Sequence, residues 1–303
     1  MIDFQRLALS DRTVYAPILK NASQRGCEYS FANLYLWGRQ RVAMVDGCMV
    51  FFSQFNRKTV YPFPVGSGDL HAALEAIIAD AQSRDIPCRI TGLTGEDVAW
   101  LQENYPGRFR IHSDRAGYDY VYDIHALADL KGRPYQKKRN HVNKFYKAYP
   151  QVQVVPLTDD LVPQVETMLN TWYANRLEED PQADFHMERT ALFKALKDYK
   201  TLCMEGIALV DGNKVLAFSL GSPLNETTFD IHFEKALSET DGAYPAINQA
   251  FARYLREKYP SVEFLNREDD MGLEGLRKAK LSYYPHHMVE KSWACLLEEG
   301  YEY

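Results

Sequence analysis

The sequence lacks any long apolar run. Its most apolar stretch, residues 42–52, is interrupted by Asp46 and Gly47 and is far shorter than the roughly 20 residues that a membrane-spanning helix needs. The start of the chain also lacks a basic flank followed by an apolar core, which excludes a secretory signal peptide of the usual kind. We therefore expect a soluble, cytoplasmic protein with no integral membrane segment, whose mature chain begins at Met1.

Cysteine is scarce, and the sequence has no CxxC pair. The cysteines are odd in number and widely spaced, which excludes the common zinc and dithiol redox motifs. We predict that they are reduced, mostly buried side chains, and we predict no metal site. They are Cys27, Cys48, Cys88, Cys203 and Cys295.

The chain also lacks an excess of positive charge. Its formal net charge of -6 argues against indiscriminate binding of nucleic acids, because affinity for phosphates comes mainly from concentrated Lys and Arg. Local basic patches could still bind RNA. The 303 residues, 46% of them hydrophobic, are enough for two globular domains of roughly 150 residues each.

The second half of the sequence predicts alternating strands and helices. Apolar residues at helical spacing predict helices over residues 161–176, 188–199, 246–258 and 273–282. β-rich or alternating runs predict strands over residues 152–156, 206–210, 214–220, 227–235, 262–265 and 287–296. This order of elements resembles that of the GNAT superfamily of acyltransferases.

Two Asp-Gly pairs indicate a repeat of this order. Asp211-Gly212 and Asp46-Gly47 each separate two apolar runs, as in a tight β-hairpin. In the first half, a strand over 59–63 and a helix capped by Asp69 follow the hairpin, and 118–124 is the expected last strand. We predict an α+β protein of two tandem GNAT-like (acyl-CoA N-acyltransferase type) domains, each a mixed sheet flanked by helices, over residues 1–125 and 126–303. The alternative is chance similarity between two ordinary α+β halves.

A basic segment lies at the junction of the halves and contains Lys137, Lys138 and Arg139 in succession. Pro134 suits the first turn of a helix. An apolar stripe on this helix would consist of Val142, Phe145, Tyr146 and Tyr149. With Asn140, the three cations could hold a phosphate or the backbone of an RNA acceptor end. The alternative is a solvated basic face on a linker helix.

A second segment, residues 266–285, follows a predicted strand and gathers acidic and basic groups around two glycines. Ligands often bind where strands of α/β sheets end. We expect Asn266, Arg267, Asp270, Arg277 and Lys280 to bind the substrate, with the three cations pointing at a common anion. The alternative is an ion-pair network that fixes the last helix against the sheet.

These two segments resemble the phosphatidylglycerol lysyltransferase C-terminal domain family, in its short soluble branch. Residues 132–145 match GRxYxxKRNHxNxF and residues 266–285 match NRExDxGxxGLRxAKxSYxP, within a resemblance that spans essentially the whole chain. The resemblance implies a tandem GNAT fold related to enzymes that move amino acids from aminoacyl-tRNA to lipid or peptidoglycan acceptors. The membrane-spanning part of the anchored members is absent from this sequence, so a small molecule, a peptide and a lipid headgroup all stay open as acceptors.

The predicted strand over 227–235 carries the candidate catalytic residues. Acyl transfer needs a group that takes a proton from the acceptor and a group that stabilises the oxyanion. Glu234 is the first candidate for the base and His232 the second, because GNAT-like folds place proton acceptors on or beside this strand. Tyr283 could protonate the leaving group.

Three functions remain open from the sequence. The usual GNAT pyrophosphate loop is rich in glycine, whereas the corresponding segment here, residues 239–245, has one glycine and two acidic residues. We therefore rank transfer from aminoacyl-tRNA first and transfer from acyl-CoA, the alternative donor and cofactor, second. The third alternative is a degenerate tandem GNAT protein that only binds a ligand or partner.

Overall fold

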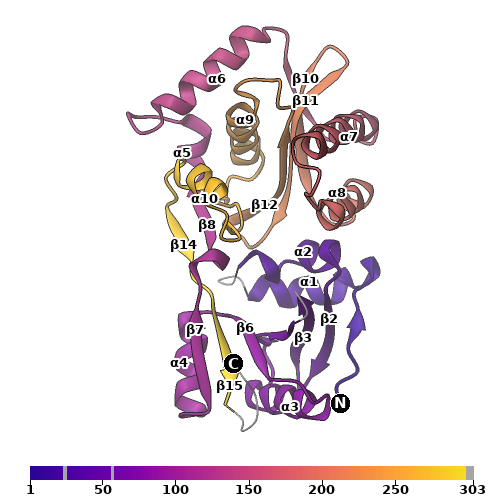
Figure 1. Ribbon diagram of the computed structural model, residues 1–303, viewed down its shortest axis with the longest axis vertical. Helices are drawn as coiled ribbons and strands as arrows, with labels where there is room; N and C mark the ends of the chain where they lie inside the picture. The colour runs from indigo at the N-terminus through magenta and orange to yellow at the C-terminus, as the bar shows by residue number, and fades with distance from the viewer. Residues whose placement is uncertain (23–25, 56–57, 298–303) are drawn as a thin grey trace. The chain divides into compact units, whose positions relative to one another are not determined.

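The protein is described from a computed structural model, which covers residues 1–22, 26–55 and 58–297 (Figure 1). The chain forms two compact units, each with its own mixed β-sheet and apolar core. Unit 1 contains Met1–Asp119, Asp269–Arg277 and the segment that begins at Met288. Unit 2 contains Tyr120–Glu268 and Lys278–His287. Along the described part of the chain, no helix is both long enough and apolar enough to cross a membrane.

The sheet of unit 1 contains the first predicted hairpin. β2 (Gln40–Val45) and β3 (Cys48–Phe55) are antiparallel, and Asp46 and Gly47 form the turn with φ of 46° and 80°. Positive φ at both residues is the geometry of a type I′ turn, so this prediction is confirmed. The other strands are β1 (Gln5–Arg6), β4 (Lys58–Pro62), β5 (Val65–Gly66), β6 (Arg89–Leu93), β7 (Phe109–Ser113) and β15 (Ser292–Leu296). Their order is β1-β2-β3-β4-β6-β15-β7, and β5 pairs with β3.

The helix expected after Asp69 is α3 (Leu70–Ser83). The Asp69 carboxylate accepts a hydrogen bond from the Ala72 backbone N–H at 3.1 Å, which caps the helix as predicted. Leu74, Ile77 and Ile78 form its buried face. The helix connects β4 to β6, which run parallel. The other helices of unit 1 are α1 (Arg12–Asn21), α2 (Phe31–Trp37) and α4 (Gly95–Asn104).

Unit 2 repeats the order of hairpin, strand, helix and parallel strand. β10 (Glu205–Asp211) and β11 (Lys214–Pro223) form the hairpin, and Asp211 pairs with Lys214, so the turn is Gly212-Asn213. β12 (Thr228–Ala236) follows antiparallel to β11, and helix α9 (Ala243–Lys258) leads to β13 (Phe264–Asn266), which is parallel to β12. The two hairpins thus occupy equivalent places in the two units. The sheet has the order β14-β8-β13-β12-β11-β10-β9, with β8 (Asp119–Asp123), β9 (Gln153–Pro156) and β14 (His287–Val289).

Helices cover both faces of this second sheet. α9 lies on one face, and α7 (Val162–Glu179) and α8 (His186–Asp198) lie on the other (Figure 1). α9 also contacts α5 (Ile124–Asp129) and α6 (Gln136–Ala148). The predicted apolar stripe of α6 is confirmed at Val142 and Phe145, which are buried. α10 (Glu274–Leu281) contains one of the points at which the chain passes from one unit to the other, after Arg277.

The last strand in the first half of the sequence lies in the sheet of unit 2, and the last strand in the second half lies in the sheet of unit 1. We expected the strand over 118–124 to complete the first half, but β8 pairs with β13. We expected one final strand over 287–296 in the second half. Instead this segment divides into β14, which joins β8, and β15, which lies between β6 and β7 (Figure 1). Each unit is therefore built from more than one segment of the chain, because alternation specifies the faces of a strand but not its partner.

Candidate functional site

The candidate base Glu234 lies in a polar cluster inside unit 2. Arg267, just after β13, donates from Nη2 to Glu234 Oε1 at 2.9 Å, and Asn248 of α9 donates to Oε2 at 3.3 Å. The Glu234 side chain is 11% exposed and that of Arg267 is 16% exposed. Glu234 therefore holds two neighbouring polar groups with its two carboxylate oxygens. We call Glu234, Arg267, Asn248, Tyr283 and Lys138 the Glu234 cluster.

Two buried polar atoms of this cluster have no hydrogen-bond partner among the described residues. Within residues 1–22, 26–55 and 58–297, neither Arg267 Nη1 nor Asn248 Oδ1 has a hydrogen-bond partner, although both are buried. Burial alone would lower the pKa of Arg267, but the Glu234 carboxylate outweighs it and raises that pKa. Arg267 thus stays charged. A buried donor and a buried acceptor without partners are costly unless a ligand satisfies them.

Tyr283 lies between two cations. The Lys138 ammonium is 3.8 Å from the centroid of the Tyr283 ring, and the Arg267 guanidinium is 5.1 Å from it. Such distances are those of cation–π contacts. Burial raises the pKa of the Tyr283 hydroxyl, which keeps it protonated. No sequence pattern indicated that Asn248 belongs here, because a single polar residue in a helix forms no pattern of its own.

The three successive cations of the basic segment have three different environments. Lys137 is exposed, Lys138 is half-buried over Tyr283, and Arg139 donates to the backbone carbonyls of Leu130 and Gly132 beyond the end of α5. Of the three, Lys137 is thus the one whose side chain is exposed, and joint binding of a phosphate by all three stays a prediction. Successive residues on a helix point about 100° apart, so three consecutive cations cannot all lie on one face of α6.

An open groove lies at the start of α6. Its lining consists of Arg133, Pro134, Gln136, Lys137, Asn140 and Tyr284. Arg133 and Lys137 are both exposed there, beside the N-terminal end of the helix. Two cations and a positive helix end favour an anion. The predicted residues Lys137 and Asn140 are thus brought together, and Arg133 joins them.

The second segment is held by internal partners. Lys280 donates from Nζ to the backbone carbonyls of Arg267 and Glu268, and Asn266 Oδ1 accepts from the Glu268 N–H at 2.7 Å. In unit 1, Arg277 donates to both oxygens of Asp270 at 2.7 and 3.0 Å. Each of the cations expected to share an anion thus has its own partner. This arrangement favours the ion-pair network over a common anion site.

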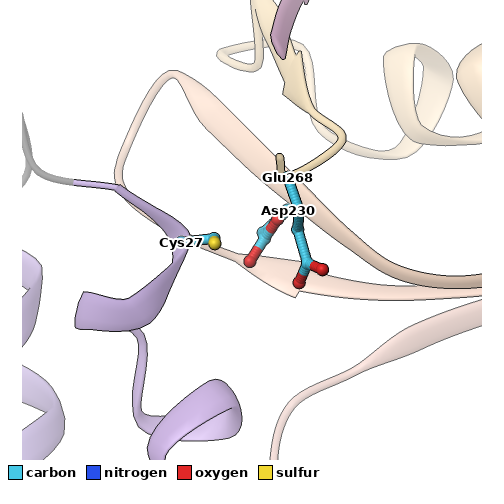
Figure 2. Close-up of side chains that lie close together, drawn as sticks. All are labelled: Cys27, Asp230 and Glu268. Carbon is cyan, nitrogen blue, oxygen red and sulfur yellow. The ribbon is translucent and has the colours of Figure 1, made fainter. Parts of the chain in front are cut away.

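His232, the second candidate base, belongs to a separate cluster. His232 Nε2 is 2.8 Å from Ser222 Oγ, and Nδ1 lies 3.5 Å from Asp230 and 3.4 Å from Glu268. Figure 2 shows the Asp230 and Glu268 carboxylates, which approach within 4.8 Å of each other. We call these four residues the His232 cluster. Sequence analysis singled out neither carboxylate, although Asp230 stands two residues before His232.

A β-bulge places the imidazole. Leu220 pairs with Phe233 but Gly221 pairs with Ile231, which leaves His232 as the extra residue on β12. A Cβ on Gly221 would lie 2.3 Å from the Asp230 carbonyl oxygen, so only glycine permits this approach. We expected one polar and one apolar face on this strand. The bulge interrupts that alternation, and Asp230 and His232 are both buried.

We predict that the His232 cluster makes stability depend on pH. Burial lowers the pKa of His232, but Asp230 and Glu268 outweigh it and raise that pKa above its ordinary value of 6.5. A raised pKa in the folded state stabilises the fold fully below the unfolded pKa, and this contribution is lost as the pH rises through the folded value. Urea unfolding between pH 5 and 10 should therefore show a larger loss for the wild type than for His232→Gln. His186→Gln, at an exposed histidine, is the control, and equal slopes for all three proteins would contradict the prediction.

In unit 1, a lysine pairs with two members of a group of possible metal ligands. Cys27, Glu28 and Asp119 bring their ligand atoms within 4.8 Å of one another. The Lys291 ammonium lies 2.7 Å from both Glu28 and Asp119. Burial lowers the pKa of Lys291, but the two carboxylates raise it well above its ordinary value. The lysine thus supplies the positive charge that these carboxylates need.

Comparisons with known proteins agree with this architecture. A family model described as "Phosphatidylglycerol lysyltransferase, C-terminal" matches residues 19–295. A crystal structure of a conserved protein of unknown function from Bacteroides thetaiotaomicron is 38% identical, with a TM-score of 0.90 over 98% of this chain and 100% of that one. The structure of L-PGS from Bacillus licheniformis is similar in fold, at 12% identity and a TM-score of 0.70 over 98% and 94% of the two chains.

A curated relative matches part of the chain. An uncharacterised protein of Mycoplasmoides gallisepticum is 28% identical over 207 residues, which are 67% of this chain. The match spans 63% of that relative's own length. The structural comparisons and the repeated order of elements show a fold of two tandem GNAT-like domains.

Proposed function

The chain belongs to the phosphatidylglycerol lysyltransferase C-terminal family, and from this premise we propose that it moves an aminoacyl group from aminoacyl-tRNA to an amine or hydroxyl acceptor. The acceptor is a small molecule, a peptide or a lipid headgroup. Acyl-CoA is the competing donor. The observation that carries the choice between the donors is the covered N-terminus of α9.

A CoA pyrophosphate needs open backbone N–H groups at a helix N-terminus. In unit 2 the corresponding end is that of α9, and α6 covers it. A Cβ on Gly242, the residue before α9, would lie 2.4 Å from the His141 carbonyl oxygen and 3.1 Å from Phe145 Cβ. Asp241 adds a negative charge beside this end and pairs with Lys144. Both the contact and the charge oppose a pyrophosphate here.

The equivalent helix end in unit 1 is also engaged. The Asp69 carboxylate occupies the first turn of α3 by accepting from the Ala72 N–H. Gly68 approaches the Asp46 carbonyl so closely that a Cβ there would lie 1.9 Å from the oxygen. Gly68 thus allows this loop to pack closely against the β2–β3 hairpin. An acidic cap also repels phosphate, so this end supports the same choice of donor.

The Glu234 cluster fits the chemistry of an aminoacyl ester. Arg267 Nη1 is a charged donor that can bind the ester carbonyl oxygen and stabilise the oxyanion that forms when the acceptor attacks. Asn248 Oδ1 is an acceptor suited to the α-ammonium group of the amino acid. Glu234 orients both side chains. A simple acyl group has no ammonium to satisfy Asn248, which also favours the aminoacyl donor.

The groove at α6 is where we expect the phosphates of the tRNA to bind. Arg133, just before α6, and Lys137, in its first turn, are both exposed, and the same helix carries Lys138 toward Tyr283. The acceptor end of a tRNA bound along α6 could therefore reach both the groove and the Glu234 cluster. Because the chain has a net charge of -6, we expect few phosphate contacts and a modest dependence of affinity on salt.

Titration of labelled aminoacyl-tRNA and of CoA across a salt series tests the proposal. We expect saturable binding of the charged tRNA, and the double variant Arg133→Ala/Lys137→Ala should weaken it and reduce the salt slope by about two, since each lost phosphate contact lowers the slope by about one. Lys197→Ala/Lys200→Ala, which removes two exposed cations at the end of α8, is the matched control. Saturable CoA binding without tRNA binding at low salt would contradict the proposal. Binding of neither would favour a protein that only binds a partner.

A further inference from the structure

We propose that Lys138 is the group that takes the proton from the acceptor, an inference that rests on the proposed transferase function. The sequence placed Lys138 among RNA-binding cations. In the structure its side chain turns away from the groove that contains Lys137 and lies over Tyr283. Its spacing explains this direction, because Lys138 stands four residues before Val142 and seven before Phe145, on the buried side of α6.

Lys138 is next to the groups that would bind the reacting ester. Tyr283 contacts both the Lys138 ammonium and the Arg267 guanidinium, at 3.8 and 5.1 Å from the ring centroid. Arg267 is the residue whose Nη1 is unsatisfied within the described part of the chain. A carbonyl oxygen bound at Arg267 would thus put the carbonyl carbon, and the acceptor that attacks it, on the side of the cluster where Lys138 lies.

The surroundings of Lys138 favour a neutral amine. The pKa of Lys138 is lowered to about 8, first by burial and then by the positive charge of Arg267, while Glu234 opposes this shift. No carboxylate of the described residues lies within ion-pair distance of its Nζ. A base works best when its pKa is near the working pH. Roughly a tenth of Lys138 is then neutral at pH 7 and about half at pH 8, far more than for an ordinary lysine.

The other candidates are less suited to this role. Both oxygens of Glu234 accept hydrogen bonds from Arg267 and Asn248. His232 belongs to a different cluster, its Nε2 is engaged by Ser222, and the neighbouring carboxylates favour its protonated form. Tyr283 remains protonated because burial raises its pKa. Lys138 is thus the group of the Glu234 cluster that can be both basic and unpaired.

The step balances without a further reactant. The acceptor oxygen or nitrogen attacks the ester carbonyl carbon, a new C–O or C–N bond forms, and the acceptor proton moves to Lys138 Nζ. Arg267 stabilises the oxyanion. When the intermediate collapses, the ester C–O bond breaks, and the leaving ribose oxygen takes the proton from the Lys138 ammonium. The lysine returns to its neutral form, and Glu234 holds Arg267 throughout.

Competitive labelling tests the state of the amine without any assay of transfer. The wild-type protein is treated with limiting acetic anhydride from pH 6 to pH 11, and the modification of each lysine is measured by peptide mass spectrometry. We expect the labelling of Lys138 to have a midpoint near pH 8, well below the ordinary lysine value of about 10.4. The exposed Lys147 is the internal reference for the reactivity of the reagent. A midpoint near the ordinary value for Lys138 would overturn the inference.

Kinetics of Lys138→Arg tests the role itself. Arginine keeps the positive charge and the contact with Tyr283 but cannot accept a proton. We expect kcat to fall by about 100-fold or more, with KM changed by less than about threefold, and Lys197→Arg, at an exposed lysine of α8, to be unaffected. In Lys138→Ala, added primary amines should restore part of kcat, which a structural role would not permit. Thermal unfolding checks that each variant folds.

The outcomes separate this inference from the proposed function. Absence of transfer by the wild-type protein from every charged tRNA tested would contradict the transferase itself. If the wild type transfers normally, retention of at least a tenth of kcat by Lys138→Arg would overturn the role of Lys138 alone. The same holds if Lys138→Ala loses tRNA affinity but keeps kcat, because Lys138 would then be a phosphate contact.

Discussion

Replacing Arg267 with methionine is expected to lower the free energy of unfolding by about 3–5 kcal/mol, because it leaves a buried carboxylate without its partner. Glu234 is 11% exposed and depends on Arg267 Nη2 at 2.9 Å. The same change removes the proposed oxyanion donor, so kcat should fall by about 100-fold or more. Urea unfolding and single-turnover transfer measure the two effects.

A matched ion pair provides the control for Arg267. Arg176 and Glu179 are 2.7 Å apart, but their side chains are about half exposed. Exposed pairs contribute about 0–1 kcal/mol, so Arg176→Met should change stability little. The double variant Glu234→Gln/Arg267→Met should recover part of the lost stability but none of the activity, since it contains no buried charge. Equal effects of the two methionine variants on stability would show that burial of the Glu234 pair is immaterial.

Replacing Lys291 with methionine is expected to have a similarly large effect on unit 1, about 3–5 kcal/mol. The ammonium lies 2.7 Å from both Asp119 and Glu28, and the Asp119 side chain is fully buried. Removing the lysine leaves two carboxylates close together, and at least one of them must then bind a proton. Stability of this variant should therefore improve more than that of the wild type as the pH is lowered from 8 to 5.

The control for Lys291 is an ion pair of similar length at the surface. Lys131 lies 2.9 Å from Asp129, and its side chain is 85% exposed. Lys131→Met should change the urea midpoint only slightly. A small effect of Lys291→Met, or a loss of stability that does not depend on pH, would contradict the assignment of Lys291 as the partner of both carboxylates.

The sequence predicted the local elements well. The Asp46-Gly47 turn, the cap at Asp69 and the apolar stripe of α6 depend on residues within one or two turns of each other, and all are present. The turn of the second hairpin is Gly212-Asn213, one residue later than the Asp-Gly pair indicated. The partners of β8 and β15 could not be predicted, because they lie far apart in the sequence and alternation does not encode them.

The sequence predicted several residues of the candidate site but not how those residues contact one another. Glu234 and Arg267 were both singled out, but their ion pair was not, since it joins β12 to the end of β13. Lys138 was identified as one of three equivalent cations. Its position four residues before Val142 was the available signal that it faces inward. Neither the pattern nor the composition of the sequence identifies Asn248 or Glu268 as a site residue.

The place of β15 between β6 and β7 has a consequence for how the chain is made. A ribosome releases the N-terminal residues first, and N-terminal domains usually fold while the rest is being synthesised. Unit 1 cannot complete its sheet in this way, because β7 receives its partner β15 only after Leu296 has been synthesised. By then all strands of unit 2 have already been synthesised. The nascent chain thus carries the unpaired edges of β6 and β7 until late, and such edges are where aggregation or capture by a chaperone begins.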